Sequence, residues 1–171
     1  NALGKIASAR NFRLCFHHHM GTVVQTAAET TRMLQQTDAK YVYLCYDTGH
    51  FIFAGENPVE MLHQHINRVG HVHLKDVRLK TLERVHQEQM SFLTAVREGT
   101  FTVPGDGNFD FSPVFELLSD ANYTGWLLVE AEQDPAKANP FEYAKKARAY
   151  IAQPTRLKRL RHGRALFRLS F

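Results

Sequence analysis

The chain has 171 residues and lacks several features that would assign it to a class of protein. No stretch approaches the ~18 consecutive apolar residues of a transmembrane helix, so we expect no membrane partner. The first 13 residues have no apolar signal-peptide core and do not begin with methionine, and we expect a cytoplasmic protein. Cysteine occurs only at Cys15 and Cys45, in two different predicted strands, and two cysteines cannot build a disulfide framework. Internal repeats, low-complexity segments and a glycine-rich phosphate cradle are also missing.

Acidic residues are missing from the C-terminal end of the chain. Residues 155–171 contain no aspartate or glutamate but six basic residues, namely Arg156, Lys158, Arg159, Arg161, Arg164 and Arg168. The rest of the chain has 15 basic and 17 acidic residues, so the net charge of +4 comes from this end. We expect a mildly acidic domain over residues 1–152 and a basic tail over residues 153–171 that is non-native or disordered. The alternative for the tail is a nucleic-acid or membrane patch, and we expect no nucleic-acid partner.

What the sequence does contain is a repeated pattern of strands and helices. Four continuous apolar runs are typical of buried parallel strands, and they span residues 11–16, 41–46, 69–74 and 126–129. Helix start signals follow at the capping box Thr26–Glu29 and at the pairs Asn57–Pro58, Ser112–Pro113 and Asn139–Pro140. A further short helix is predicted over residues 91–98, whereas residues 49–55 and 76–88 are predicted to be loops.

This order predicts an α/β protein in which strands and helices alternate around a parallel sheet. A whole parallel (β/α) TIM barrel has eight strand–helix units and about 250 residues, so four units predict about half a barrel, which we assign to the C-terminal half. Without the other half, the edge strands would lack neighbours. We therefore expect the chain alone to be marginally stable, prone to form a homo-oligomer, and inactive.

Three predicted strands end in side chains that can bind a metal ion. Asp47, His73 and Glu130 each lie at the C-terminal end of a different strand, where the active sites of TIM barrels lie. Mixed carboxylate and imidazole ligands suit a divalent cation such as Mn²⁺, Co²⁺ or Zn²⁺. The alternative is that each residue is a separately hydrogen-bonded polar group. Three such strand ends together favour a metal site.

Neighbouring residues are candidates for proton transfer. His50 can move a proton or contact a substrate hydroxyl, and the alternative is a solvated loop histidine. Lys75 follows His73 on the same side of a strand. Near a metal its pKa could be lowered, so that it acts as an acid or base, or it could simply neutralise a carboxylate such as Asp76. We predict that both His50 and Lys75 are catalytic.

The run His17–His19 ends the first predicted strand. Alternation along a strand puts His17 and His19 on one face and His18 on the other. One of the first pair can complete the metal shell, or both can bind substrate hydroxyls. The turn-rich segment Val103–Gly107 is either a lid over the site or an ordinary turn.

Five segments together resemble the myo-inosose-2 dehydratases of the xylose isomerase-like TIM-barrel superfamily. They are His17–Thr22, Asp47–His50, Gly70–Arg78, Val103–Gly107 and Glu130–Pro140. The resemblance runs from about Leu14 to Ile151. The Asp47–His50 segment and the His71–His73 piece of the third segment are common across the superfamily. The last two of the five are more particular to the dehydratases.

The resemblance implies a lyase that removes water from a cyclic polyol ketone, 2-keto-myo-inositol (scyllo-inosose), in inositol catabolism. The product is a trihydroxycyclohexane-dione, and the expected cofactor is Mn²⁺ or Co²⁺. The superfamily pattern implies that Asp47, His73 and Glu130 are ligands. Its fourth ligand is commonly a glutamate on the preceding strand, and that position falls near His17 here.

We assign His17 as the fourth ligand and predict substrate binding by His19, Asp76 and Arg78. Two alternatives remain open at the level of the sequence. One is a sugar or keto-sugar isomerase or epimerase of the same superfamily, and the other is an inactive fragment.

Overall fold

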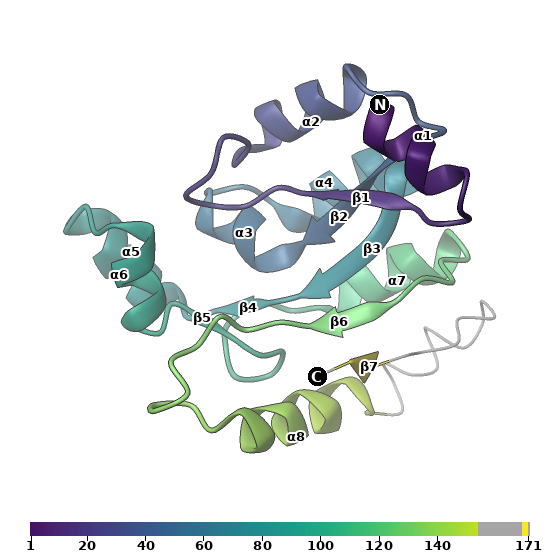
Figure 1. Cartoon of the computed structure of the whole chain (residues 1–171). Helices are drawn as coiled ribbons and strands as arrows, with labels where there is room; N and C mark the ends of the chain where they lie inside the picture. The colour runs from purple at the N-terminus through teal and green to yellow at the C-terminus, as the bar shows by residue number, and fades with distance from the viewer. Residues whose placement is uncertain (154–168, 171) are drawn as a thin grey trace.

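The structure is a computed structural model that describes residues 1–153 and 169–170 (Figure 1). Its elements, in chain order, are α1 (Ala2–Ser8), β1 (Leu14–His17), α2 (Ala27–Gln35), β2 (Val42–Asp47), α3 (Thr48–Phe53), α4 (Pro58–His65), the 3₁₀ helix η1 (Ile66–Arg68), β3 (Val69–Leu74), β4 (Asp76–Val77), α5 (Leu79–Gln87), α6 (Phe92–Arg97), β5 (Phe101–Thr102), α7 (Ser112–Asp120), β6 (Leu127–Val129), α8 (Pro140–Ile151) and β7 (Leu169–Ser170).

The main sheet has the strand order β1-β2-β3-β6-β7, and every pairing in it is parallel. Its first four strands lie where the four apolar runs predicted them, and helices connect them. The parallel α/β prediction is therefore confirmed. Since all these strands run in one direction, their C-terminal ends meet at a single edge of the sheet.

The predicted caps begin their helices as expected. Thr26 and Glu29 form a complete capping box at α2, because Thr26 Oγ1 accepts the N–H of Glu29 and Glu29 Oε2 accepts the N–H of Thr26. Asn57 and Asn139 accept backbone N–H groups at the starts of α4 and α8, each of which has proline in its first turn.

Two expected loops are helices, and these predictions were wrong. Residues 76–88 contain β4 and α5, and residues 48–53 form α3. In α5 the buried residues Leu82 and Val85 are only three apart, and exposed charged residues surround them in the sequence. They pack with Phe101 in a small second core between α5, α6 and the β4–β5 pair, which the sequence pattern did not reveal. The helix α1 was not predicted either.

The two faces of the main sheet differ in character. Leu44, Tyr46, Val72 and Leu74 are fully buried in the main core, beneath side chains of α2, α4, α7 and α8. The residues between them on β2 and β3 alternate to the other face. That face therefore receives cysteine, aspartate and histidine side chains.

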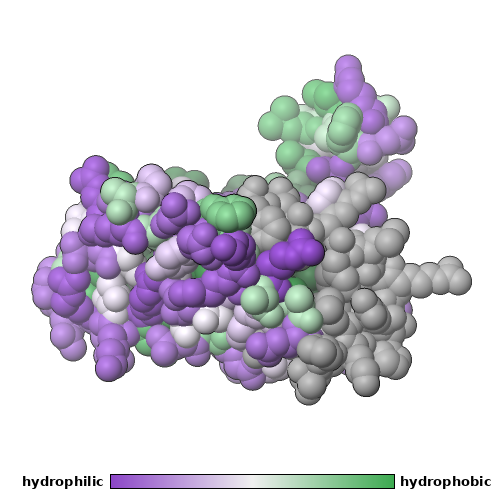
Figure 2. Space-filling model, turned by 90° about the horizontal axis from the view of Figure 1, so that it is seen from below, coloured by the Kyte–Doolittle hydropathy of each residue, from purple (hydrophilic) through white to green (hydrophobic). Residues whose placement is uncertain are grey.

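The outer surface gives no sign of a bilayer-crossing element. In Figure 2 the left part of the visible face is mainly hydrophilic, whereas hydrophobic residues gather on a lobe at the upper right. Among residues 1–153 and 169–170, no helix has the length and apolar content that crossing a membrane requires.

The basic tail was predicted to lie outside the domain. Residues 154–168 and 171 are outside the described residues, so this remains a prediction. Leu169 and Ser170 form β7, which pairs with β6 in parallel register.

Candidate metal centre

Four side chains from four neighbouring strands meet at the C-terminal edge of the main sheet. His17 and Asp47 are the last residues of β1 and β2, His73 is the penultimate residue of β3, and Glu130 directly follows β6. The register places Asp47 opposite His73, and His73 opposite Leu128. Parallel pairing thus brings together residues that are far apart in the sequence.

The polar atoms of these four residues, which we call the carboxylate set, lie within 4.8 Å of one another. Asp47 Oδ2 is 3.4 Å from His17 Nε2 and 3.3 Å from His73 Nδ1, and His73 Nδ1 is 2.7 Å from Glu130 Oε2. The structure therefore brings together all four residues that sequence reasoning assigned to a metal.

The carboxylate set leaves its facing atoms without hydrogen bonds. His17 Nε2, Asp47 Oδ2, His73 Nδ1 and Glu130 Oε2 are all buried, and none has a hydrogen-bond partner among the described residues. Their contacts with one another and with Lys75 are ion pairs rather than hydrogen bonds. Four such atoms aimed at one point fit a bound divalent cation, which would coordinate all of them.

The charges in the set also favour a cation. Burial raises the pKa of Asp47, but Lys75 and then His17 and His73 outweigh it and hold that pKa well below its usual value. Burial likewise raises the pKa of Glu130, and His73 and Lys75 bring it below normal. Burial lowers the pKa of His73, whereas contacts with Asp47, Cys45 and Glu130 raise it, to about 11. A metal ion must therefore displace a proton from His73.

Lys75 lies next to the carboxylate set and is completely buried. Its Nζ is 2.6 Å from Glu132 Oε2, 3.2 Å from Glu130 Oε2 and 3.4 Å from Asp47 Oδ2. Burial lowers the pKa of Lys75, but these three carboxylates raise it above its usual value. The predicted lowering of the Lys75 pKa concerns a protein with a bound metal and stays a prediction; without the metal, Lys75 neutralises three carboxylates. Asp76 is not one of them.

Gly49 explains how such a long side chain reaches the site. A Cβ atom at Gly49 would lie only 2.5 Å from Lys75 Cγ. Glycine in the Asp47–His50 segment thus leaves the space through which the Lys75 stem passes.

His50 and His19 form a second group with Glu132. His50 is fully buried, so the solvated-loop alternative is wrong. Its Nε2 is 2.9 Å from Lys75 Nζ, and burial lowers the pKa of His50 to about 2. The His19 and His50 ring centroids are 3.9 Å apart, and His19 Nε2 is 3.3 Å from Glu132 Oε1.

Sequence reasoning missed Glu132 as a functional candidate. The only signal was its position two residues after Glu130. Glu132 contacts His19, His50 and Lys75, and its backbone has a φ of 42°, a conformation that a glutamate seldom adopts. Strained backbone of this kind is common at functional sites.

His18 points away from the metal centre, as alternation predicted. It is fully buried and stacks on Phe51 with ring centroids 3.8 Å apart. Burial lowers the pKa of His18 to about 4, so it is neutral at pH 7.

The structure does not bring Asp76 and Arg78 into the carboxylate set. Each oxygen of Asp76 accepts two backbone N–H groups, and the donors are Val77, Gly105, Gly107 and Phe109. Arg78 contacts Asp106 Oδ2 at 2.5 Å and the carbonyl of Gly99 at 2.6 Å. Their polar groups anchor the Val103–Gly107 segment, and their assignment to substrate binding stays a prediction.

Two glycines of the Val103–Gly107 segment lie so close to neighbouring residues that no side chain would fit there. A Cβ at Gly107 would lie 2.3 Å from Asp76 Oδ1, and one at Gly105 would lie 2.5 Å from a Tyr150 ring atom. Gly105 also has a φ of 87°. The segment is therefore a tightly held turn in this structure.

Comparison with known proteins agrees with the geometry. The family described as "Xylose isomerase-like TIM barrel" matches residues 1–153. An inosose dehydratase of Clostridium beijerinckii is 56% identical over 155 residues, which are 91% of this chain and 52% of that protein. One of Clostridium tetani is 58% identical over 153 residues, 90% of this chain and 51% of that protein. The chain spans about half the length of the curated relatives it matches.

Solved structures agree with the fold. The probable 3-DHS dehydratase AsbF of Bacillus anthracis has a TM-score of 0.67 at 16% identity, over 90% of this chain and 55% of that chain. The IOLI protein with a binding zinc atom has a TM-score of 0.60 at 19% identity, over 95% of this chain and 54% of that one.

Proposed function

We propose that this chain, which belongs to the xylose isomerase-like TIM barrel family, carries the metal site of an inosose dehydratase. The observation that carries the proposal is the carboxylate set, with four buried atoms that converge and lack hydrogen-bond partners. The names of relatives at 50–58% identity supply the substrate class, a cyclic polyol ketone. The reaction is loss of water from 2-keto-myo-inositol.

His17, Asp47, His73 and Glu130 would hold the divalent cation. Carboxylate oxygens with imidazole nitrogens suit Mn²⁺ or Co²⁺. A zinc atom in the structurally similar IOLI protein supports the view that this fold can hold a divalent metal. When bound, the cation supplies Lewis acidity for the substrate ketone and, as a nearby positive charge, lowers the pKa of Lys75.

Lys75 and the residues around it have different roles in the proposed reaction. Lys75 Nζ would carry the proton: made neutral beside the bound cation, it takes the proton from the carbon next to the ketone and then gives it to the departing hydroxide, so that water leaves. His50 stays neutral, because burial lowers its pKa to about 2, and its Nε2 orients Lys75 from 2.9 Å. Glu132, 22% exposed, and His19, 26% exposed, are the proposed contacts for substrate hydroxyls.

Asp76 and Arg78 act on the substrate through the turn that they hold. The two cysteines are free, which suits the reducing cytoplasm that we propose as the location.

The test compares metal binding with product formation. Residues 1–171 should bind one Mn²⁺ or Co²⁺ per chain in a calorimetric titration. Co-expression with the complementary N-terminal half of the C. beijerinckii relative should then yield dione from 2-keto-myo-inositol. An epimerised or isomerised polyol ketone as the product would instead support the isomerase alternative. Absence of metal binding would overturn the proposal.

A further inference from the structure

Cys45 lies beside the carboxylate set without belonging to it. It is only 4% exposed and comes two residues before Asp47 on β2, so the two side chains point to the same face of the sheet. The register places Cys45 opposite His17 on β1 and opposite His71 on β3. Cys45 is therefore one step further from the strand ends than Asp47, on the same polar face.

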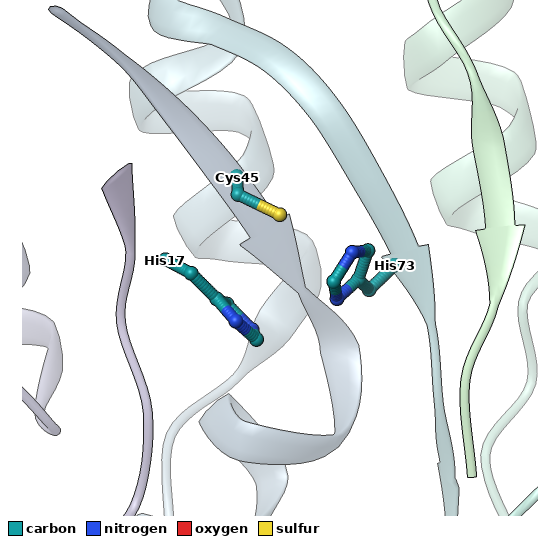
Figure 3. Close-up of side chains that lie close together, drawn as sticks. All are labelled: His17, Cys45 and His73. Atoms are coloured by element: carbon teal, nitrogen blue, oxygen red, sulfur yellow. The ribbon is translucent and has the colours of Figure 1, made fainter. Parts of the chain in front are cut away.

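The same two imidazoles that face the carboxylates also lie close to this thiol. One ligand atom each from His17, Cys45 and His73 can be chosen so that all three lie within 4.8 Å of one another. Figure 3 shows the three side chains, from three adjacent strands, directed into one space, with the sulfur to one side of the two rings. We call these three residues the thiol set.

The spacing of the thiol set suits a tetrahedral metal ion. From usual zinc–nitrogen and zinc–sulfur bond lengths, neighbouring ligand atoms lie about 3.3–3.7 Å apart, so side-chain rotations of modest size close the set on a metal. His17 Nε2 and His73 Nδ1 are buried without hydrogen-bond partners among the described residues. Neither imidazole must break a hydrogen bond at these atoms in order to bind.

We propose that His17, Cys45 and His73 form a second metal-binding mode, selective for thiophilic divalent cations such as Zn²⁺ and Cd²⁺. A thiolate with two imidazoles is a ligand set that these cations prefer, whereas Mn²⁺ prefers the carboxylate oxygens of Asp47 and Glu130. The sulfur–metal bond replaces the S–H bond of Cys45, the nitrogen–metal bond replaces an N–H bond of protonated His73, and both protons pass to solvent. Because both modes use His17 and His73, a thiophilic cation in the thiol set competes with a cation in the carboxylate set.

Cys15 provides a matched control for Cys45. It lies on the adjacent strand β1, is half-buried and carries a free thiol. Within residues 1–153, however, it joins no group of side chains that could hold a metal.

The test is a titration of residues 1–171 with Cd²⁺, followed through the ultraviolet sulfur-to-cadmium charge-transfer band. Only a thiolate ligand produces this band. We expect it in the wild type, in Cys15→Ser and in the double variant Asp47→Asn with Glu130→Gln. In Cys45→Ser the band should vanish. The Cd²⁺ affinity should fall at least about tenfold, because even the loss of a residue that only hydrogen-bonds a metal ligand lowers metal affinity by that much. A wild type without the band, or a band that survives Cys45→Ser, would overturn the proposal.

A second measurement needs no variant and so does not depend on whether Cys45→Ser folds. Cd²⁺ should slow the alkylation of Cys45 in the wild-type chain by at least about tenfold, because a sulfur bound to the metal cannot react with the reagent. The alkylation rate of Cys15 should stay nearly unchanged. Equal alkylation rates of Cys45 with and without Cd²⁺ would contradict the thiol set. Neither readout depends on Asp47 or Glu130, so a failure of the thiol set can be told apart from a failure of the proposed dehydratase function.

Discussion

Two buried aspartates of this chain use their oxygens in opposite ways. Asp76 is 1% exposed, and its two oxygens accept four backbone N–H groups from its own strand and the turn it holds. Asp47 is fully buried, and only its Oδ1 accepts a hydrogen bond, from the N–H of His50. Its Oδ2 faces His17, His73 and Lys75 without a hydrogen bond. A satisfied carboxylate holds the chain in place, whereas an unsatisfied one is available to a ligand.

The largest expected effect is on the stability of the chain, when Asp76 is replaced. Asp76→Ala leaves up to four buried N–H groups without their acceptor, so we expect the free energy of unfolding to fall by about 3 kcal/mol or more. Urea denaturation of the metal-free chain measures this. Asp120→Ala, at an exposed position on α7, is the control and should change stability by less than about 0.5 kcal/mol. Equal losses in both variants would remove the distinction between the two aspartates.

The next effect is on metal affinity, at the carboxylate set. Glu130→Gln should lower Mn²⁺ affinity at least about tenfold, since a charged ligand is lost. The metal-free stability should change by less than about 1 kcal/mol, because Lys75 keeps Asp47 and Glu132 as partners. Calorimetric titration and urea denaturation measure the two quantities separately. Glu83→Gln, exposed on α5, should alter neither.

His18 extends the comparison to a histidine. Its ring nitrogens are also buried and without hydrogen bonds, but among the described residues it belongs to no group of side chains that could hold a metal. The pKa of His18 in the folded chain, about 4, lies below the usual histidine value of 6.5, so the unfolded chain binds the proton more readily. Stability from this residue is present above pH 6.5 and is lost as the pH falls toward about 4. His18→Phe should remove that loss, worth about 1–2 kcal/mol near pH 5.

Urea denaturation of both proteins across this range is the measurement. Mn²⁺ affinity at neutral pH should be unchanged in His18→Phe. Weaker Mn²⁺ binding by His18→Phe would mean that a buried histidine outside the carboxylate set also affects the metal affinity.

The smallest effect is expected at the basic tail, whose described residues Leu169 and Ser170 form the short edge strand β7 beside β6. Deleting residues 155–171 should lower the melting temperature by less than about 5 °C, because the charge of this segment is of one sign, it includes no acidic partner, and its described pairing with the sheet is two residues long. Thermal denaturation of the truncated chain measures it. A larger drop would mean that the tail is part of the fold.

The sequence was informative where one local rule decided the outcome. Apolar runs predicted β1, β2, β3 and β6, and Thr26, Asn57 and Asn139 marked helix starts through their caps. Helix α5 was missed because its core partners, such as Phe101, come from a distant segment. No local pattern reveals burial that depends on a later strand.

The same limit applies to the site. The strand ends indicated Asp47, His73 and Glu130, because parallel strands end at one edge. Sequence reasoning assigned Asp47 to the metal and Asp76 to substrate binding, but it did not predict that backbone N–H groups of Val77 and of the turn around Gly107 satisfy Asp76. Glu132 was missed because its contacts with Lys75 and His19 arise from three separate elements.

The central claim is that His17, Asp47, His73 and Glu130 hold one divalent cation. An anomalous difference map from crystals of residues 1–171 grown with saturating Mn²⁺ tests it most directly. We expect one strong peak, about 2.0–2.3 Å from His17 Nε2, Asp47 Oδ2, His73 Nδ1 and Glu130 Oε2. A peak coordinated by other residues, or no peak in this space at saturating metal, would contradict it.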